Sequence, residues 1–525
     1  MSVGSFMLPD VQSKLSKFNL SETLITGINT DYLYPVYSKE LSPGDSFEID
    51  ISAVAKMSPL VAPFMTPLKM KFYAFWVPNT QIWKGFKEFM GEEKWKDANP
   101  DRVVPSLSFK NVLTEESIYD YFGIPIVEGV TPQQYTDAHL SALRFRAYYK
   151  IWNDWFRSPE LQEPVEYSED DTEIVDCYKL LKVGKNYDLF TSCLPTPAAV
   201  DVEIGLTGNA PVMSPKDGSF ALNLTHQSPG QDFNYDIKTG DNRVLIGTPG
   251  QGRPITGPAD THLYADMENV TGVSIFALRH ASAMQVLFEK EGYYGRRYFE
   301  LVKAHWGVDM PEFLTGRSIF LGSVSNEVQV NPVVQNSATS DVSPQGNLAG
   351  IGTLFANGRI AEMSAVEHGQ LIVLAAVQNE NIYQQGIDRE LFRRTRFDYP
   401  YLEFCNIGDQ PIYQKELFFT GKPEEDEKVF GYSERYGELR TGTNRITGRL
   451  RSSSKNSLDV WTLAEKFENA PKLNGTFLES AVPLKRALAV LDEPAFILSV
   501  NFNVDAYRVL TQRAVPSLLA GRLTD

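Results

Sequence analysis

Residues 42–53, SPGDSFEIDISA, decide the fold class of this chain. Apolar and polar side chains alternate along them, with Phe47, Ile49, Ile51 and Ala53 on one side and Glu48, Asp50 and Ser52 on the other. A period of two is typical of a β-strand with one buried face, and the Pro43-Gly44-Asp45 sequence before it indicates a turn. A second strand is predicted at 68–77, LKMKFYAFWV, and stops at Pro78.

Turn-forming residues are spread along the whole chain. The 525 residues include 37 Gly and 31 Pro, which interrupt helices and separate short strands. The longest clean apolar stretch, 371–377, has the length of a buried strand and falls far short of the ~20 residues that cross a bilayer. The start MSVGSFMLPD lacks the basic and apolar regions of a secretory signal. We therefore expect a mainly β protein with long loops.

Charge and cysteine content exclude several classes of protein. The chain has 66 acidic and 50 basic residues and a net charge of −16, so any binding of nucleic acid or anionic lipid must be local. Cys177, Cys193 and Cys405 are widely separated and form no C-x-x-C pair. They indicate reduced thiols, not a disulfide framework or a zinc site.

Three helices are predicted within the β framework. The first covers 79–91, where Asn79 or Thr80 can cap the N-terminus, and the second covers 137–158. The third covers 274–290. Their many aromatic residues are expected in the core or in contacts between subunits.

Residues 206–262 differ in character from the rest of the chain. They are rich in Gly, Pro, Asn, Asp and Thr and contain few bulky apolar residues. A segment of this length and composition cannot form a large core of its own, so it is either disordered or a functional excursion that packs on something else.

No catalytic or metal-binding motif is found. The sequence lacks a phosphate-binding loop, an H-E-x-x-H motif and a G-x-S-x-G elbow. The six histidines are scattered without a local metal-binding pair: His139, His226, His262, His280, His305 and His368. We therefore predict no catalytic residue, no cofactor and no metal ligand.

One segment is locally basic. Residues 433–455 contain six cationic side chains against Glu434 and Glu438, and they are Arg435, Arg440, Arg445, Arg449, Arg451 and Lys455. Together with Tyr436 they could follow a single-stranded nucleic-acid backbone, or they could pair with carboxylates of a neighbouring subunit or loop. A second cluster, with the same two interpretations, consists of Arg389, Arg393, Arg394 and Arg396.

The chain resembles the major capsid proteins of the Microviridae, especially the gokushovirus-like branch. The resemblance rests on a succession of blocks in a fixed order: LSPGDSFEID (41–50), FYAFWVPNTQIWKGFKEFMGE (72–92), LRFRAYYKIWNDWFRS (143–158), DLFTSCLPTP (188–197), GRRYFELVKAHWGV (295–308), FLGSVSNEVQVNPVVQNSAT (320–339), EHGQLIVLAAV (367–377), IYQQGIDRELFRRTRFDYPYLEF (382–404) and RYGELRTGTNRITGRLRSSSKNSLDVWTLAEKF (435–467). Residues 206–262 match no block, and the end PSLLAGRLTD is only loosely similar to the tail of the family.

The resemblance implies one capsid domain over 1–525, an eight-stranded antiparallel viral jelly roll with long inter-strand loops and inserted helices. It implies a T=1 shell of sixty copies around circular single-stranded DNA, assembled in the bacterial cytoplasm. Because sixty copies would carry about −960 charges, a small basic virion protein is expected with the DNA. Residues 206–262 are expected to form a protrusion that binds a host receptor. The alternative from another class is a carbohydrate-active jelly-roll enzyme or a lectin.

Overall fold

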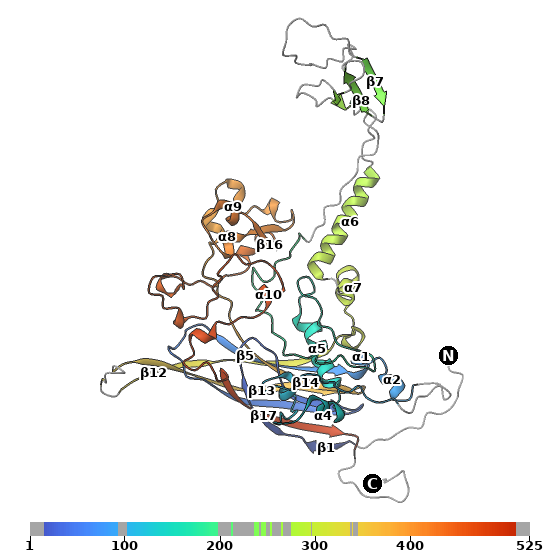
Figure 1. Cartoon of the computed structure of the whole chain (residues 1–525), viewed down its shortest axis with the longest axis vertical. Coiled ribbons are helices and arrows are strands. Elements are labelled where there is room, and N and C mark those ends of the chain that lie inside the picture. Colours follow the sequence, from blue (N-terminus) through green and yellow to red (C-terminus); the bar gives the residue numbers. More distant parts are fainter. Residues whose placement is uncertain are drawn as a thin grey trace, which may run out of the picture. The chain divides into compact units, whose positions relative to one another are not determined.

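The computed structural model describes residues 15–92, 102–197, 275–295, 297–336, 339 and 345–510, and the backbone of five short strands between residues 212 and 265 (Figure 1). By its contacts the chain divides into two compact units, Met1–Ala198 with Lys290–Asp525, and Ala199–Glu289.

The second unit contains two small antiparallel sheets, β10-β6 and β7-β8-β9. Their strands are β6 (Val212–Met213), β7 (Asp236–Gly240), β8 (Arg243–Gly247), β9 (Arg253–Pro254) and β10 (Tyr264–Ala265). Apart from these backbones, the insertion predicted at 206–262 lies outside the described residues.

A six-stranded antiparallel sheet forms one layer of the first unit. Its order is β1-β17-β4-β13-β12, with β2 also paired to β17. The strands are β1 (Ser16–Asn19), β2 (Glu22–Ile28), β4 (Ser46–Met57), β12 (Gln329–Val334), β13 (Leu348–Ser364) and β17 (Phe496–Arg508). The strand predicted from 42–53 is confirmed as β4, in which the apolar residues of the alternating pattern are buried.

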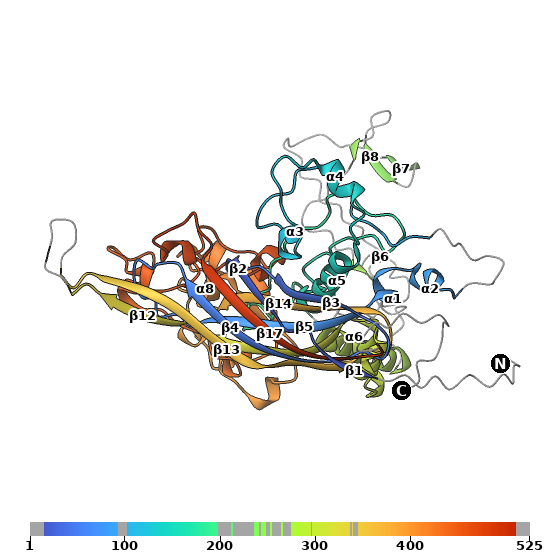
Figure 2. The same cartoon turned by 90° about the horizontal axis from the view of Figure 1, so that it is seen from below.

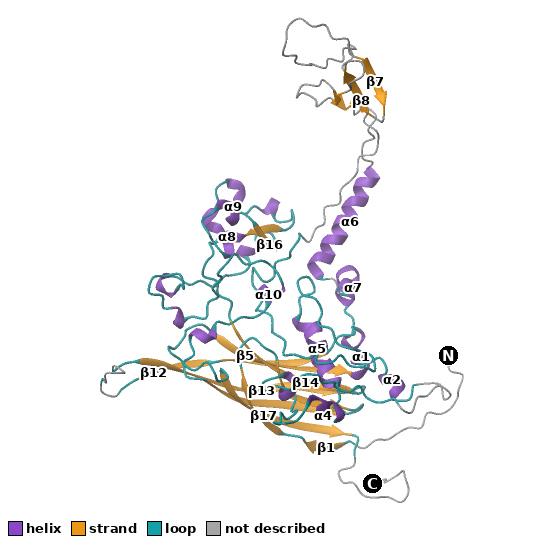
Figure 3. Cartoon of the chain, in the orientation of Figure 1, coloured by secondary structure: helices purple, strands orange, loops and turns teal. Residues whose placement is uncertain are grey.

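A four-stranded antiparallel sheet, β11-β5-β14-β3, forms the second layer (Figures 2 and 3). Its strands are β3 (Tyr34–Leu41), β5 (Leu68–Pro78), β11 (Ile319–Glu327) and β14 (Gly369–Asn379). The strand predicted at 68–77 is confirmed as β5. In β14 every residue except the last is buried, which explains the continuous apolar run at 371–377.

Two apolar cores cover the two faces of the four-stranded sheet. Between the sheets, Phe72 and Val373 pack in one cluster with Ile49. On the opposite face, Phe75 and Ile372 pack in a second cluster with the helices that follow β5. Burying each such side chain contributes about 1.5–3 kcal/mol, so β14 and β5 stabilise both interfaces at once. The described part of the chain is therefore mainly antiparallel β-sheet with added helices.

The single helix expected over 79–91 is instead two short helices, α1 (Asn79–Ile82) and α2 (Phe86–Phe89). Trp83 interrupts them with an extended backbone, because its fully buried indole donates a hydrogen bond from Nε1 to Asp171 Oδ1 at 2.7 Å. The predicted cap by Asn79 or Thr80 is also wrong. The Asn79 Oδ1 accepts from Gln370 Nε2 at 3.2 Å, and the side chain of Thr80 contacts Glu367.

The helix expected over 137–158 is shorter and begins later. The segment contains the end of α4 (Pro132–Asp137), then α5 (Leu143–Ile151) and a π-helical turn at Trp152–Phe156. Residues 140–142 cannot be helical because their backbone pairs with 105–107, as in the 2.7 Å bond from the Leu107 N–H to the Leu140 carbonyl.

The third predicted helix is present as α6 (Ile275–Tyr294), which extends beyond residue 290. A helix that was not predicted, α7 (Tyr298–Trp306), follows it. The remaining short helices are α3 (Ile118–Tyr121), α8 (Gln414–Leu417), α9 (Pro423–Asp426) and α10 (Gly475–Leu478). No helix among the described residues is long and apolar enough to span a bilayer.

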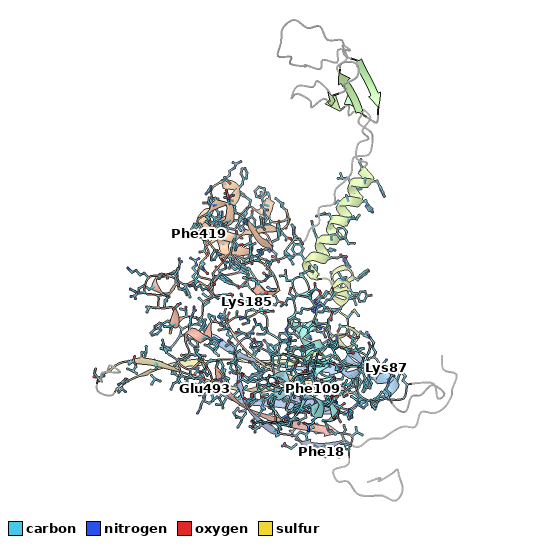
Figure 4. The ribbon with its side chains drawn as sticks, in the orientation of Figure 1. Phe18, Lys87, Phe109, Lys185, Phe419 and Glu493 are labelled. Carbon is cyan, nitrogen blue, oxygen red and sulfur yellow. The ribbon has the colours of Figure 1, made fainter. Side chains whose placement is uncertain are left out.

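A long connection, 380–495, links β14 to β17 across the two sheets and shares a small apolar core with residues 189–193. It contains the antiparallel hairpin of β15 (Gln410–Tyr413) and β16 (Val429–Ser433). In Figure 4, the label Phe419 lies in this connection, and the label Lys185 lies in a segment that contacts it. Lys185 Nζ lies 2.6 Å from Glu465 Oε2 and 4.3 Å from the ring centre of Phe477, so it ties the connection to the body of the unit.

Candidate functional site

The structure brings the two arginine clusters of the sequence together at the β15–β16 hairpin. A 3₁₀ turn at Arg389–Phe392 lies against β15, where Arg389 Nη2 donates to the Pro411 carbonyl at 2.8 Å. Residues after β16 lie beside the same turn, because Arg393 Nη2 lies 3.3 Å from Glu438 Oε1. Segments about 45 residues apart in sequence therefore share one surface.

This surface contains a hollow of about 540 Å³, which we call the basic hollow. Its charged lining comprises Arg389, Arg393, Arg394, Lys415 and Arg435 with Asp398, Glu427 and Glu438. Its aromatic lining comprises Phe392, Phe397, Tyr413 and Tyr436. Five cations face three carboxylates, an excess of two positive charges in a protein whose net charge is strongly negative.

Some of the cations in the basic hollow are neutralised and others are not. Glu438 accepts from Arg393, and the buried Glu416 lies 3.7 Å from Arg389. Burial raises the pKa of Glu416, and the nearby Arg389 acts in the opposite direction. In contrast, no carboxylate of the described residues forms an ion pair with Arg394 or Arg435, and the Nε of Arg435 is buried without a hydrogen-bond partner.

The Asp398 carboxylate accepts hydrogen bonds from nearby backbone N–H groups. It accepts from the Arg394 N–H at 2.9 Å and from the Thr395 N–H at 2.7 Å, and these bonds lower its pKa. The lowered pKa keeps Asp398 ionised, because hydrogen bonds from backbone N–H groups stabilise the charged form. Its charge therefore caps the 3₁₀ turn at Arg396–Asp398.

The aromatic rings of the hollow are covered by cations. Lys415 Nζ lies 4.3 Å from the ring centre of Phe392 and 5.3 Å from that of Tyr413. The guanidinium of Arg435 lies 5.6 Å from the ring centre of Tyr436. Because cations occupy these ring faces, the hollow is built to attract negative charge more than to stack a flat apolar ring.

The other predicted site residues do not form one stripe. Arg440 pairs with Glu434. Arg445 lies 2.8 Å from Asp388 and is 70% exposed, so its charge remains accessible to a partner. A second hollow of about 500 Å³, beside the basic hollow, is lined by Arg445, Arg451 and Arg389 among others.

Two further arginines of the predicted set, Arg449 and Arg451, form hydrogen bonds within their own loop. Arg449 donates from Nε and Nη2 to the carbonyl of Asn456, and Arg451 donates from Nε to that of Ile446 at 3.1 Å. Lys455 is exposed. These bonds fix the loop around the 3₁₀ turn at Gly448–Leu450 and leave positive charge on its surface.

Lys415 was not predicted as a site residue, because it is an isolated cation between Gln414 and Glu416 in the sequence. No sequence signal marks it, since it joins the arginines only through the folding of the hairpin. Arg396 was predicted with its cluster but does not line the basic hollow, and its guanidinium lies over the ring of Phe397 at 4.7 Å.

The described residues contain no group of three His, Cys, Asp or Glu side chains that could hold a metal ion. The described thiols are also poor nucleophiles where they are buried. Burial raises the pKa of Cys193 to about 12 and that of Cys177 to about 11, so both remain protonated at neutral pH.

Apolar side chains, interrupted by Ser499, lie in a row across the outer face of the six-stranded sheet. On neighbouring strands, Phe355 of β13 lies opposite Val54 of β4. Ser499 of β17 lies opposite both Val54 and Ile25 of β2. Phe355 is 67% and Ile25 72% exposed. Ile497, two positions before Ser499, is also exposed. Contiguous exposed apolar residues on a folded protein are typical of a contact surface.

Comparison with known proteins gives matches along almost the whole chain. The model of a family described as "Capsid protein (F protein)" matches residues 7–518. The chain is 33% identical to the capsid protein VP1 of Chlamydia phage 1, with 97% of each chain covered. It is 34% identical to that of Bdellovibrio phage phiMH2K, with 97% and 96% covered, and 31% identical to that of Spiroplasma virus 4, with 96% and 95% covered.

Proposed function

Because the chain belongs to the capsid protein (F protein) family of the Microviridae, we propose that sixty copies close into a T=1 icosahedral shell around a circular single-stranded DNA genome. The protein is a major capsid protein and a component of the virion, not an enzyme. Membership of a capsid protein family argues against the alternative of a carbohydrate-active enzyme or a lectin. Assembly is proposed to take place in the cytoplasm of the bacterial host.

The observation that carries this proposal is the order of the strands. Eight strands lie in the orders β2-β17-β4-β13 and β3-β14-β5-β11, and along the chain they alternate between the two sheets except at β5 and β11, which follow one another in the four-stranded sheet. Such an arrangement is what an eight-stranded antiparallel jelly roll requires, with β1 and β12 as additions at the edges. Two packed sheets with long loops suit a shell subunit, since the sheets give rigidity and the loops give contact surface.

The exposed apolar row on the six-stranded sheet supports self-assembly. Identical subunits in closed symmetry need large complementary surfaces, and apolar side chains supply the association free energy when they are covered. The direct test is electron microscopy and sedimentation of the purified chain. Shells of sixty subunits are expected, and a protein that remains a monomer or small oligomer under all assembly conditions would contradict the proposal.

The net charge of −16 per chain means that DNA cannot be held by general attraction. We therefore propose that a small basic protein accompanies the genome and that local arginines contact phosphates. Mass spectrometry of purified, DNA-filled particles is expected to detect that second polypeptide. Filled particles composed of this chain alone would refute its requirement.

The loop that carries Arg445, Arg449 and Arg451 is proposed to face either the DNA or a seam between subunits. Replacing all three with Gln removes three charges together with the bonds that Arg449 and Arg451 donate to their loop, and should reduce shell yield or DNA content while the isolated subunit, checked by thermal melting, stays folded. Loss of DNA alone favours a phosphate contact, and loss of shells favours a seam. Normal yields of filled particles would make these residues an ordinary solvated surface. Lys466→Gln, which removes an exposed cation outside the predicted set, is the control.

Residues 206–262 are proposed to form an outward protrusion, shared by symmetry-related copies near a three-fold axis and used to attach to the host. Their low content of large apolar residues supports this, because such a segment must borrow packing from neighbours. Replacing 206–262 with a short Gly/Ser linker should leave shells intact and abolish adsorption to host cells. Unchanged adsorption, or an unfolded subunit, would refute the proposal.

A further inference from the structure

The loop between β15 and β16 places unpaired negative charge beside the unpaired positive charge of the basic hollow. This loop, 414–428, ends in the acidic turn 421–428, GKPEEDEK, which contains α9. Glu427 of the turn lines the hollow itself, and so does Lys415 at the start of the loop. The cationic hollow and the acidic turn therefore lie on one face of one hairpin.

Hydrogen bonds to a buried aspartate hold the backbone of the acidic turn, and two of its glutamates have no ion-pair partner among the described residues. The buried Asp426 carboxylate accepts hydrogen bonds from the Thr420 N–H and hydroxyl, both at 2.8 Å, and from the Gly421 N–H at 3.0 Å. Glu424 is exposed, and within the described part of the chain no cation forms an ion pair with it or with Glu427. The turn therefore presents two carboxylates on a hydrogen-bonded backbone.

Not all of the five cations of the hollow are paired with a carboxylate of the residues that the structure describes. Arg394 and Arg435 have no ion-pair partner among the described residues, although Glu427 lines the same hollow. The ring faces beneath the cations are already covered, so the missing ligand is recognised by negative charge and not by stacking. A carboxylate meets this requirement, and arginine binds carboxylates through paired N–H donors.

We propose that the acidic turn of a second copy of this chain occupies the basic hollow, and that the contact is reciprocal across a two-fold axis. A two-fold contact uses the same patch on both subunits, so a patch that combines a cationic hollow with an adjacent anionic turn is complementary to itself. Each contact then contains two hollow–turn pairs. The inference rests on the proposed shell, in which identical subunits meet around symmetry axes.

A charge exchange between Arg394 and Glu424 tests the contact. Both side chains are exposed, and among the described residues Arg394 forms hydrogen bonds through its backbone N–H alone, so reversal of either charge should leave the subunit fold intact. Arg394→Glu alone and Glu424→Lys alone should each reduce shell yield about tenfold or more at physiological salt, because each creates two like-charge clashes per contact. The double variant Arg394→Glu with Glu424→Lys should restore the yield to within about twofold of the original protein.

Arg394→Lys is the matched control, because it keeps the charge and should assemble normally. Circular dichroism and thermal melting of the unassembled variants check that the subunits are folded, and Arg394→Gln replaces Arg394→Glu if the latter is not. Single variants that assemble normally, or a double variant that stays defective, would overturn the pairing. Normal shells of Arg394→Glu with reduced DNA content would identify a phosphate ligand and also overturn it. If the unchanged protein forms no shells, that result contradicts the proposed function itself, and the inference is refuted together with it.

Discussion

Arg146 offers a test of how the helical layer is held on the four-stranded sheet. Its side chain is fully buried in α5, and its guanidinium bonds twice to Glu173 Oε2, from Nε at 2.9 Å and from Nη2 at 2.6 Å. It also donates to the carbonyls of Ile82 at 3.2 Å and Asp170 at 2.9 Å. Tyr178 donates to the other oxygen of Glu173 at 2.6 Å, so both charges are satisfied.

Arg146→Met leaves the buried carboxylate without a counter-charge and two carbonyls without donors. Removing one partner of a buried pair costs about 3–5 kcal/mol, so the free energy of unfolding of the unassembled subunit should fall by that amount. Urea titration followed by tryptophan fluorescence measures it, since the buried Trp83 and Trp152 belong to the same core.

The double variant Arg146→Met with Glu173→Gln removes the uncompensated charge and keeps an acceptor for Tyr178. It should therefore recover at least about 1.5 kcal/mol relative to Arg146→Met alone. Lys17→Met, which breaks the exposed pair with Asp505, is the control and should have no measurable effect. A loss below about 1 kcal/mol in Arg146→Met, or no recovery in the double variant, would refute the reasoning.

Three further outcomes follow from the buried groups. Because burial raises the pKa of Cys193 to about 12, iodoacetamide at pH 8 should label it far more slowly than the partly exposed Cys405, as peptide mass spectrometry can check, and equal rates would contradict its burial. The raised pKa of Glu416 means that the folded state binds its proton more readily than the unfolded state. The original protein should therefore gain stability relative to Glu416→Gln as the pH falls through the raised pKa of Glu416 toward the ordinary value of 4.5. Thermal melting of both proteins at several pH values measures this difference. A difference that does not vary with pH would refute the prediction. Gly386→Ala should lower stability by about 1–3 kcal/mol in the same melts, because the added Cβ would collide with the Glu416 carbonyl oxygen, and an unchanged melting temperature would contradict that packing.

Alternation in the sequence predicted β4 correctly because one face of this strand meets the core, and the strand predicted at 68–77 is present as β5, which packs against a core on each face. Helix boundaries were less predictable, since they depend on distant partners. Trp83 breaks the expected helix to reach Asp171, and residues 140–142 leave helical geometry to pair with 105–107. Nothing within the local sequence marks either partner.

For the candidate site, the sequence identified most of the cations but not their environment. Arg445 pairs with Asp388 and Arg393 with Glu438, each across more than 40 residues, so the pairing depends on the fold of the 380–495 connection. Lys415 enters the hollow only because the hairpin folds back. Counting charges in the sequence therefore identifies the cationic residues of the site, but long-range contacts decide which of them are paired with carboxylates.

The position of β17 in the six-stranded sheet has a consequence for biosynthesis. β17 lies between β2 and β4, and about 440 residues separate it from the end of β4. At roughly 5–20 residues per second, a ribosome needs about 20–90 s to make that interval. During this time β2 and β4 lack β17, the strand that pairs with both, and their unpaired backbone edges are available to other chains. Chaperone binding to nascent chains should therefore persist until β17 emerges, and a truncated chain without β17 would have no completed sheet with which to enter a growing particle.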